Sequence, residues 1–410
     1  MTKKFYEKTP TERLNQLSLT AELRQDFAAE QNLVNAAIVE NYITDFREPE
    51  GVLQRLQVDG HFYTVPMAIE EPSVIAAANN GARMLNFNGG IFTEKIQSAA
   101  LTLGQLLFED VNVTALHEFI DQYTAEIQRV ADQAKPSIVK RGGGLVKVQL
   151  RELSQKLVSV DFLIDTKEAM GANIVNTILA AEKEFFHPFI QQCLGAILSN
   201  DGRNNLTKVQ GRVPFAVLGG EVVAHKIAAL SRFAKVDSYR AVTENKGIFN
   251  GVGAVVLATG NDWRAVEAAG HAYASQLGSY QSLSQWSIDA NQQQLVGELV
   301  LPLPIGSIGG AITALPQAQR NLALLEQPSV QTLREIIAGV GLAQNLAALK
   351  AIASEGIQAG HMRMQYRALA LQVGAQPHEV LPLAQRLSTQ KTVDTQLASQ
   401  ILEEIRRHES

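Results

Sequence analysis

The sequence contains little of several features that identify protein classes. It has one cysteine, Cys193, in 410 residues, so it cannot form an intramolecular disulfide or a CxxC metal motif, and a reducing compartment is its natural environment. The formal net charge is only −5, which argues against a broad nucleic-acid-binding surface. Because 46% of the residues are hydrophobic, the chain has enough apolar side chains for a sizeable core, and disorder is excluded.

Common catalytic and ligand-binding motifs are also missing. The sequence contains no HExxH zinc motif, no GxSxG nucleophile turn, no GxxxxGK[ST] phosphate loop and no GxGxxG dinucleotide motif. Gly142-Gly143-Gly144 and Gly251-Val252-Gly253 come nearest to the last of these, and each lacks the final glycine at the required spacing. Composition and spacing alone therefore predict an α+β protein of roughly two or three domains.

Long apolar segments are absent as well. Residues 1–17 carry positive charges with no apolar segment after them, so we expect no signal peptide. Residues 251–260 and 336–353 are apolar, but they are short or interrupted by polar side chains, whereas a membrane-spanning helix needs about 20 apolar residues. We therefore expect a cytoplasmic protein.

The first half of the chain predicts helices, followed by an α+β module. Thr9-Pro10-Thr11-Glu12 is typical of a helix start, and short amphipathic helices are expected up to about residue 50. Residues 62–68 predict a strand and residues 74–85 a helix. Beyond residue 96 we expect strands at 101–108, 144–150 and 157–164, with helices at 113–134 and 170–184.

The second half mixes helices with fewer strands. The predicted elements are a strand at 206–218, a helix at 220–233, a polar stretch through residue 250, a strand at 255–259, a helix from residue 262 and strands near 295–301. A glycine-rich turn is expected at 306–310, and the last hundred residues are predicted to be helical.

Four segments occur in an order and at a spacing that resemble one enzyme family. They are Glu70-Glu71-Pro72-Ser73, Glu168-Ala169-Met170-Gly171-Ala172-Asn173, Asn245-Lys246-Gly247 followed by Thr259-Gly260-Asn261-Asp262, and Gly356-Ile357-Gln358-Ala359-Gly360-His361-Met362. Together they resemble hydroxymethylglutaryl-CoA reductase in its soluble bacterial class, class II. The resemblance extends from about Arg13 to the end of the chain.

The resemblance implies a fold and a reaction. The family reduces a thioester to an alcohol with two hydrides from a nicotinamide cofactor. It would give this chain an α+β fold with a large, mainly helical substrate domain (1–96 and 204–354). A small ferredoxin-like NAD(P)-binding domain (97–203) would interrupt it, and a mobile C-terminal helical flap (355–410) would follow. The different cofactor domain explains the missing dinucleotide motif.

The resemblance also implies four catalytic residues. Lys246 would stabilise the developing oxyanion, and Glu71 would donate a proton to the aldehyde oxygen. Asp262 would lie beside Lys246 and the acid, and His361 would protonate the departing coenzyme A thiolate.

Each of these residues also has a simpler structural interpretation. Lys246 could lie in a solvated turn. Asp262 could cap a helix that begins at Trp263. Glu71 is at a predicted helix start, where the helix dipole favours the ionised form over the protonated form that an acid needs. His361 could be an ordinary surface or core side chain.

Substrate and cofactor positions follow from the same resemblance. Arg240, Ser73, Asn250 and Gln344 match positions that bind the hydroxymethylglutaryl group, where the fork of an arginine suits the free carboxylate. The alternative for Arg240 is a surface ion pair. The matching cofactor-binding residues are Glu168, Met170, Gly171, Ala172, Asn173 and Asn176. The family usually has aspartate where this chain has Glu168.

A basic segment indicates which cofactor is used. Relatives that prefer NAD have an aspartate shortly before the glycine triplet, and this chain has Lys135 at about that place. Every charged residue in 133–151 is basic: Lys135, Lys140, Arg141, Lys147 and Arg151. Lysine cannot accept a hydrogen bond from the ribose 2′-hydroxyl but attracts a 2′-phosphate, so we predict that NADPH is preferred to NADH. The alternative is a solvated basic face.

The expected partners are therefore hydroxymethylglutaryl-CoA, mevalonate, coenzyme A and a second copy of the chain, with the active site at the interface of a homodimer. No metal is implied. Two other functions remain open: NAD-dependent oxidation of mevalonate in catabolism, and non-catalytic binding of an acyl-CoA or nucleotide.

Overall fold

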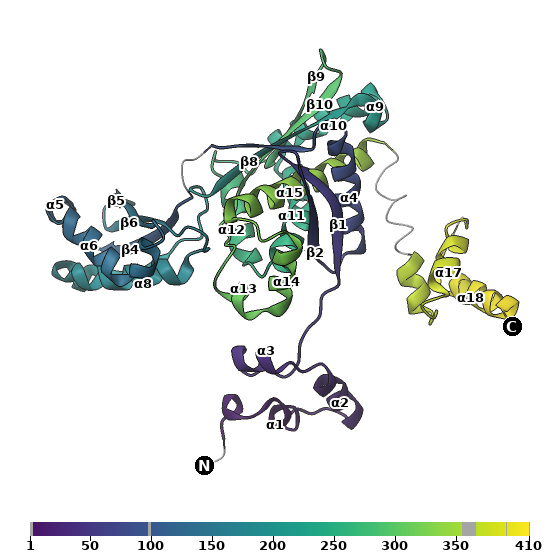
Figure 1. Ribbon diagram of the computed structural model, residues 1–410, viewed down its shortest axis with the longest axis horizontal. Coiled ribbons are helices and arrows are strands. Elements are labelled where there is room, and N and C mark those ends of the chain that lie inside the picture. Colours follow the sequence, from purple (N-terminus) through teal and green to yellow (C-terminus); the bar gives the residue numbers. More distant parts are fainter. Residues whose placement is uncertain (1–2, 97–99, 355–365, 391, 410) are drawn as a thin grey trace. The chain divides into compact units, whose positions relative to one another are not determined.

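The computed structural model describes residues 3–96, 100–354, 366–390 and 392–409 (Figure 1). Residues 1–49 form a unit separate from residues 50–410. This first unit contains the single turn η1 (Phe5–Glu7) and three short helices, α1 (Pro10–Leu14), α2 (Ala21–Ala29) and α3 (Leu33–Ile38). The predicted first helix start is confirmed, because Thr9 Oγ1 accepts a hydrogen bond from the Glu12 amide and the Glu12 carboxylate accepts one from the Thr9 amide.

The buried apolar side chains of residues 50–410 gather in three separate clusters. The first draws on residues 53–91 and 209–353, the second on residues 106–186 and the third on residues 366–405. Each of the ranges predicted for the substrate domain, the cofactor domain and the C-terminal flap contains one of these clusters, and the roles of the three ranges stay predictions.

The first cluster lies around a six-stranded sheet in the order β2-β1-β3-β8-β10-β9. Its strands are β1 (Glu50–Val58), β2 (His61–Ala68), β3 (Ile91–Glu94), β8 (Leu206–Pro214), β9 (Ser284–Asp289) and β10 (Gln294–Pro302). The helices of this region are α4 (Pro72–Asn86), α9 (Phe215–Leu218), α10 (Glu221–Val236), α11 (Ser238–Ala258), α12 (Trp263–Ala274), α13 (Ala311–Ala314), α14 (Pro316–Leu324) and α15 (Val330–Ala353). The large domain thus contains an extended sheet in addition to the helices that were expected.

The second cluster lies in a four-stranded antiparallel sheet with helices, of the βαββαβ type. Its strands are β4 (Thr102–Glu109), β5 (Gly144–Glu152), β6 (Leu157–Asp165) and β7 (Cys193–Leu198), and its helical segments are α5 (Val113–Gln122), α6 (Thr124–Ala134), α7 (Pro136–Val139), α8 (Ala172–Phe185) and η2 (His187–Gln192). The strand order β5-β6-β4-β7 is that of a ferredoxin-like module. The predicted helix at 113–134 is two helices, because the backbone leaves helical geometry at Tyr123.

Helix α11 corrects one part of the sequence analysis. The sequence predicted a polar stretch without a helix through residue 250 and a strand at 255–259. Both predictions were wrong, because one continuous helix covers nearly all of this region. Asp237 caps it by accepting a hydrogen bond from the Arg240 amide. One of its glycines serves packing: a Cβ on Gly251 would come within 3.0 Å of Gln344 Cβ, so the missing side chain lets α11 approach α15 closely.

Helix α15 is the central helix of the large domain. It is long and apolar enough to cross a membrane by length and composition alone, but 78% of its most apolar window is buried inside the molecule. It contacts α4, α10 and α11 as well as the sheet. We therefore interpret it as a core helix.

The third cluster includes α17 (Val380–Leu387) and α18 (Thr395–Glu409), whose apolar faces share Leu383, Leu387, Ile401 and Leu402. Arg406 on α18 forms an ion pair with the buried Glu379, which holds the pKa of that carboxyl at about 2. This segment therefore has its own hydrophobic cluster and its own ion pair, in which the acid is buried and the arginine is exposed.

Candidate active site

A cleft of about 690 Å³ brings together residues from both sheet-containing domains. Of the predicted cofactor and catalytic residues, it is lined by Lys135, Met170, Gly171, Ala172, Asn173 and Asp262. Its other lining residues include Arg141, Asn261, Arg264 and the turn at 308–310. The last of these belongs to the glycine-rich turn of the sequence analysis, whose role could not be inferred from spacing.

The start of α8 forms one wall of this cleft. Gly171 precedes the helix with φ of +105°, and a Cβ there would lie 2.4 Å from Thr166 Cγ2, so only glycine fits. Thr166 and Thr102 fix the preceding loop by donating hydrogen bonds to the carbonyls of Ala169 and Met170. The free amides and the dipole of a helix N-terminus attract phosphate groups, so this wall fits a dinucleotide.

Positive charge is concentrated beside this helix start. Lys135 and Arg141 both line the cleft. Arg151, from the same basic segment, instead forms an ion pair with the buried Asp161 and hydrogen-bonds it through Nη2 at 3.1 Å. Only part of the basic segment is thus directed to the cleft.

Glu168 makes contacts that the sequence did not predict. Its Oε2 accepts hydrogen bonds from Ser307 Oγ at 2.6 Å and from the Val330 amide, at the start of α15, at 2.7 Å. Its carbonyl accepts a third hydrogen bond, from the Ser307 amide, at 2.8 Å. Glu168 therefore connects the loop before α8 to the large domain, and a contact with the cofactor stays a prediction.

Asn176, the last predicted cofactor residue, lies one turn further along α8. Its Oδ1 accepts a hydrogen bond from the Leu198 amide at 3.0 Å, which ties α8 to β7. The exposed Asn173 is in the cleft lining, whereas Asn176 is not part of it.

Glu71, Ser73 and Lys246 come together although Lys246 is far from the other two in sequence. Lys246 Nζ donates to Glu71 Oε2 at 3.3 Å, and Ser73 Oγ donates to Glu71 Oε1 at 2.7 Å. Glu71 is the residue before α4, and Lys246 projects from α11, so two packed helices fix the pair. Lys246 is thus in a helix and not in a turn. Glu70, the neighbouring acid, is exposed.

Asp262 caps α12, as its structural interpretation predicted. Its Oδ1 accepts hydrogen bonds from the amides of Arg264 and Ala265, and its carboxylate binds the Arg264 guanidinium through both oxygens. The Arg264 guanidinium lowers the pKa of Asp262. Within the described ranges, Asp262 forms an ion pair with Arg264, and Lys246 forms one with Glu71. The resemblance implied that Asp262 lies beside Lys246, but no ion pair joins these two described residues.

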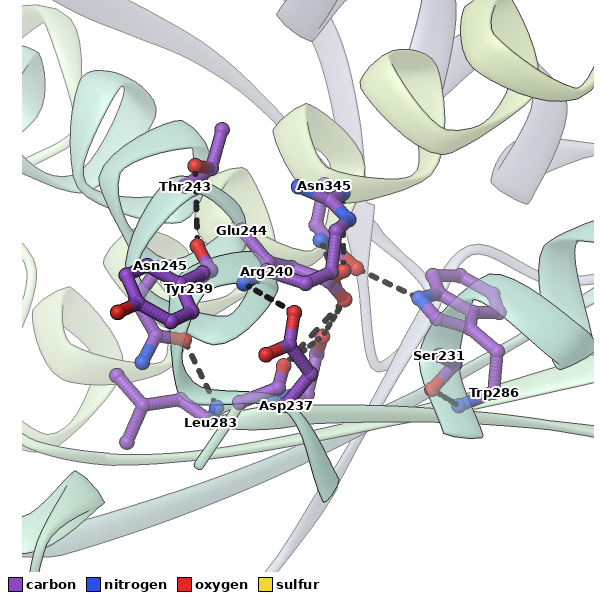
Figure 2. Close-up of polar contacts among 12 residues, drawn as sticks. Ser231, Asp237, Tyr239, Arg240, Thr243, Glu244, Asn245, Leu283, Trp286 and Asn345 are labelled. Carbon is purple, nitrogen blue, oxygen red and sulfur yellow. Dashed lines mark hydrogen bonds and ion pairs between the residues drawn. The ribbon is translucent and has the colours of Figure 1, made fainter. Parts of the chain in front are cut away.

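The four predicted substrate residues are on three helices. Ser73 is the second residue of α4, Arg240 and Asn250 are on α11, and Gln344 is on α15. Arg240 forms an ion pair with Glu244, which is buried (Figure 2). Gln344 is only 4% exposed, and its Oε1 has no hydrogen-bond partner among the described residues, so a ligand could use it.

His361 lies outside the described residues. Among the residues that the structure does describe, no three His, Cys, Asp or Glu side chains gather as a metal site would require.

Comparison with known proteins identifies the family. The sequence profile of hydroxymethylglutaryl-coenzyme A reductase matches residues 6–366. The chain is 37% identical to the Archaeoglobus fulgidus 3-hydroxy-3-methylglutaryl-coenzyme A reductase over 378 residues, which cover 90% of this chain and 85% of the relative. It is 33% identical to a probable reductase of this name from Borreliella burgdorferi, with 89% and 85% covered.

Two solved structures agree with this result. A 3-hydroxy-3-methylglutaryl-coenzyme A reductase from Streptococcus pneumoniae superposes with a TM-score of 0.77 at 41% identity, covering 98% of this chain and 99% of that chain. A class II reductase from the same organism, bound to NADPH in open conformations, gives 0.76 at 41% identity and covers 97% and 100%. The chain therefore belongs to the hydroxymethylglutaryl-coenzyme A reductase family, in its bacterial class II type.

Proposed function

We propose that this protein reduces 3-hydroxy-3-methylglutaryl-CoA to mevalonate and free coenzyme A with two molecules of NADPH, in the mevalonate pathway of isoprenoid synthesis. The observation that carries this proposal is the contact of Lys246 with Glu71, 3.3 Å apart and supported by Ser73. An ammonium and a carboxyl group at one site are what the reduction of a carbonyl requires: charge stabilisation and a proton.

The residues divide the chemistry as follows. Bound NADPH supplies the two hydrides. Lys246 stabilises negative charge on the carbonyl oxygen during both reductions, and Glu71 donates the proton that turns the aldehyde oxygen into the alcohol. His361, in the proposed flap of residues 355–410, protonates the coenzyme A thiolate when the hemithioacetal collapses to the aldehyde. Asp262 contributes negative charge at the rim of the cleft, where Arg264 keeps it ionised.

The substrate's acyl group is assigned to Ser73, Arg240, Asn250 and Gln344. Arg240 would bind the free carboxylate. Oε1 of Gln344, which has no partner among the described residues, would accept a hydrogen bond from the tertiary hydroxyl. Asn250 is half-buried on α11, one turn after Lys246, so its amide could reach the same acyl group.

NADPH would bind in the cleft at the start of α8. Two features support it: the helix N-terminus at Gly171, and Lys135 and Arg141 on the same cleft. The Streptococcus pneumoniae class II relative, at 41% identity, is described as bound to NADPH. Lys135 would contact the 2′-phosphate that distinguishes NADPH from NADH.

We also propose that the protein is a cytoplasmic homodimer with its active site at the interface. Supporting this, large apolar side chains on both sides of the α10–α11 junction are exposed: Phe233 by 58%, Val236 by 86%, Tyr239 by 88% and Val242 by 54%. A second copy of the chain would cover them, and they are next to Arg240 in sequence.

The decisive experiment is a spectrophotometric assay of cofactor oxidation with hydroxymethylglutaryl-CoA, run with NADPH and with NADH. Lys246→Ala should lower kcat by about 10²–10³, the cost of losing one oxyanion-stabilising group. Lys226→Ala, which removes an exposed lysine of α10, serves as the matched control and should leave kcat unchanged.

Three other outcomes would each point elsewhere. An undiminished rate for Lys246→Ala would refute the proposed mechanism. Binding of the thioester by the unaltered protein without any oxidation of cofactor would favour the non-catalytic alternative. Efficient oxidation of mevalonate with NAD, together with slow reduction by NADPH, would favour the catabolic direction.

A further inference from the structure

Glu244 is a buried carboxylate held by a network of polar side chains. It lies on α11 and is 2% exposed. Its Oε1 accepts hydrogen bonds from Ser282 Oγ at 3.3 Å, Ser284 Oγ at 3.2 Å and Asn345 Nδ2 at 3.4 Å. Figure 2 shows Asn345, from α15, approaching Glu244 on α11, and Ser284 reaches the same oxygen from β9.

A second layer of contacts fixes the first. Asn345 Oδ1 accepts a hydrogen bond from Trp286 Nε1 at 2.6 Å, and the Trp286 amide donates to Ser231 Oγ at 2.9 Å. Trp286 is 1% exposed, so the indole cannot move without disrupting the core. The carboxylate of Glu244 therefore has little freedom to rotate.

The other oxygen of Glu244 faces Arg240. Oε2 lies 3.1 Å from Arg240 Nη2, and this ion pair is its one compensating contact among the residues that the structure describes. Burial raises the pKa of Glu244, and the nearby Arg240 charge opposes this effect. An ionised carboxylate in this position therefore depends on the guanidinium.

Arg240 has some of its polar groups fixed by neighbouring acids and others available to a ligand. Its backbone amide is fixed by Asp237, and one guanidinium nitrogen is fixed by Glu244. In the described part of the chain, its other guanidinium donors have no hydrogen-bond partner, and its side chain is 18% exposed. A guanidinium that is oriented in advance loses less entropy when it binds a carboxylate.

We propose that Glu244 is a positioning residue: through its ion pair it orients the Arg240 guanidinium toward the free carboxylate of the substrate. The inference rests on the proposed role of Arg240. An ordinary helix-stabilising pair at this spacing would be exposed on both sides and contribute only a few tenths of a kcal/mol. Here the side chain of the acid is fully buried and that of the arginine is 18% exposed, so the buried carboxylate fixes the orientation of a guanidinium that a ligand can still reach.

Glu244→Gln tests the proposal with a side chain of the same shape and no charge. The KM for hydroxymethylglutaryl-CoA should rise about tenfold, which is the effect of losing one charge-assisted hydrogen bond between Arg240 and the substrate carboxylate. The kcat should change by less than about twofold. The affinity for free coenzyme A, which lacks the carboxylate, should be unchanged in calorimetry. Ser284→Ala is the comparison variant: it removes one of three hydrogen bonds to Oε1 and keeps the contact with Arg240, so its KM should rise much less than that of Glu244→Gln.

The result separates three cases. An equal loss of affinity for the thioester and for coenzyme A would mean that Glu244 is merely structural, and an unchanged or lower KM would overturn the inference. Arg240→Ala tests the underlying assumption separately. If it leaves KM unchanged, the proposed role of Arg240 fails; if it raises KM while Glu244→Gln does not, only the positioning role fails.

Discussion

Lys246 Nζ and Glu71 Oε2, separated by 175 positions in sequence, lie 3.3 Å apart. The lysine side chain is 66% exposed and that of the glutamate 31%. The pair is therefore open to a ligand, while Ser73 fixes the orientation of the carboxylate through Oε1.

Glu71→Gln should lower kcat by about 10²–10⁴, because the amide keeps the shape of the acid but cannot donate a proton to the aldehyde oxygen. Glu70→Gln is the matched control, since Glu70 is adjacent and exposed, and its rate should equal that of the unaltered protein. Steady-state rates with NADPH measure both. Equal losses in the two variants would contradict the assignment of Glu71.

Lys135→Asp should shift the cofactor preference from NADPH toward NADH. The lysine lines the cleft, and an aspartate would repel the 2′-phosphate and accept hydrogen bonds from the ribose hydroxyls instead. The ratio of kcat/KM for the two cofactors is the measurement. Lys140→Asp introduces the same charge change at a neighbouring exposed position outside the cleft lining and should leave the ratio nearly unchanged.

Glu168→Ala should destabilise the fold by about 1–3 kcal/mol, because it removes the acceptor for Ser307 Oγ and for the Val330 amide. Denaturant unfolding measures this loss. If Glu168 instead contacts the cofactor alone, the variant would keep its stability and only KM for NADPH would rise.

Glu182 should make stability depend on pH. It is fully buried on α8, and burial raises its pKa to about 8, an effect that the backbone of Ala131 only partly offsets. The folded state thus binds the proton more tightly than the unfolded state does. Below about pH 4.5 the carboxyl is protonated in both states and does not lower the free energy of unfolding. As the pH rises toward 8, the unfolded state ionises first, so the free energy of unfolding falls.

Glu182→Gln removes this dependence. Between pH 5 and 8, the free energy of unfolding of the unaltered protein should fall by up to about 3 kcal/mol more than that of the variant. Urea titrations at the two pH values measure the difference. Parallel pH profiles for the two proteins would contradict the raised pKa.

Local sequence signals predicted much of the fold. The helix starting at Thr9 and strands β2, β4, β5 and β6 follow from capping residues and apolar alternation, and the structure has them. Strands β1, β3, β7 and β9 were not predicted. Strand β3 has four residues, too few for a periodic pattern, and only its pairing with β1 and β8 makes it a strand.

Helix α11 shows why tertiary structure can override local signals. Gly251 and the polar residues before it favour a loop when each is considered alone. In the fold, Gly251 provides the close approach to α15, and the buried Asn245 is hydrogen-bonded to Gln281 and Leu283. Neither partner could be known from sequence.

The site was predictable only in part. The four segments implied Glu71, Ser73 and Lys246, which the fold brings together, and the cleft contains Lys135, Met170 and Asp262. Glu244 and the contacts of Glu168 could not be foreseen, because both depend on side chains from distant elements.

The position of the small domain within the chain has a consequence for biosynthesis. When the ribosome has added residue 198, all residues of the small domain's hydrophobic cluster have been synthesised. The sheet of the large domain is complete only after β8 and β10 have been synthesised, and α4 packs against α15, which comes later still. We expect the module of residues 102–198 to fold on the ribosome first, while β3 lacks its partner β8 and α4 lacks α15, both of which follow more than a hundred residues later. Protease digestion of stalled chains ending near residue 240 should leave residues 102–198 intact and cleave residues 50–90.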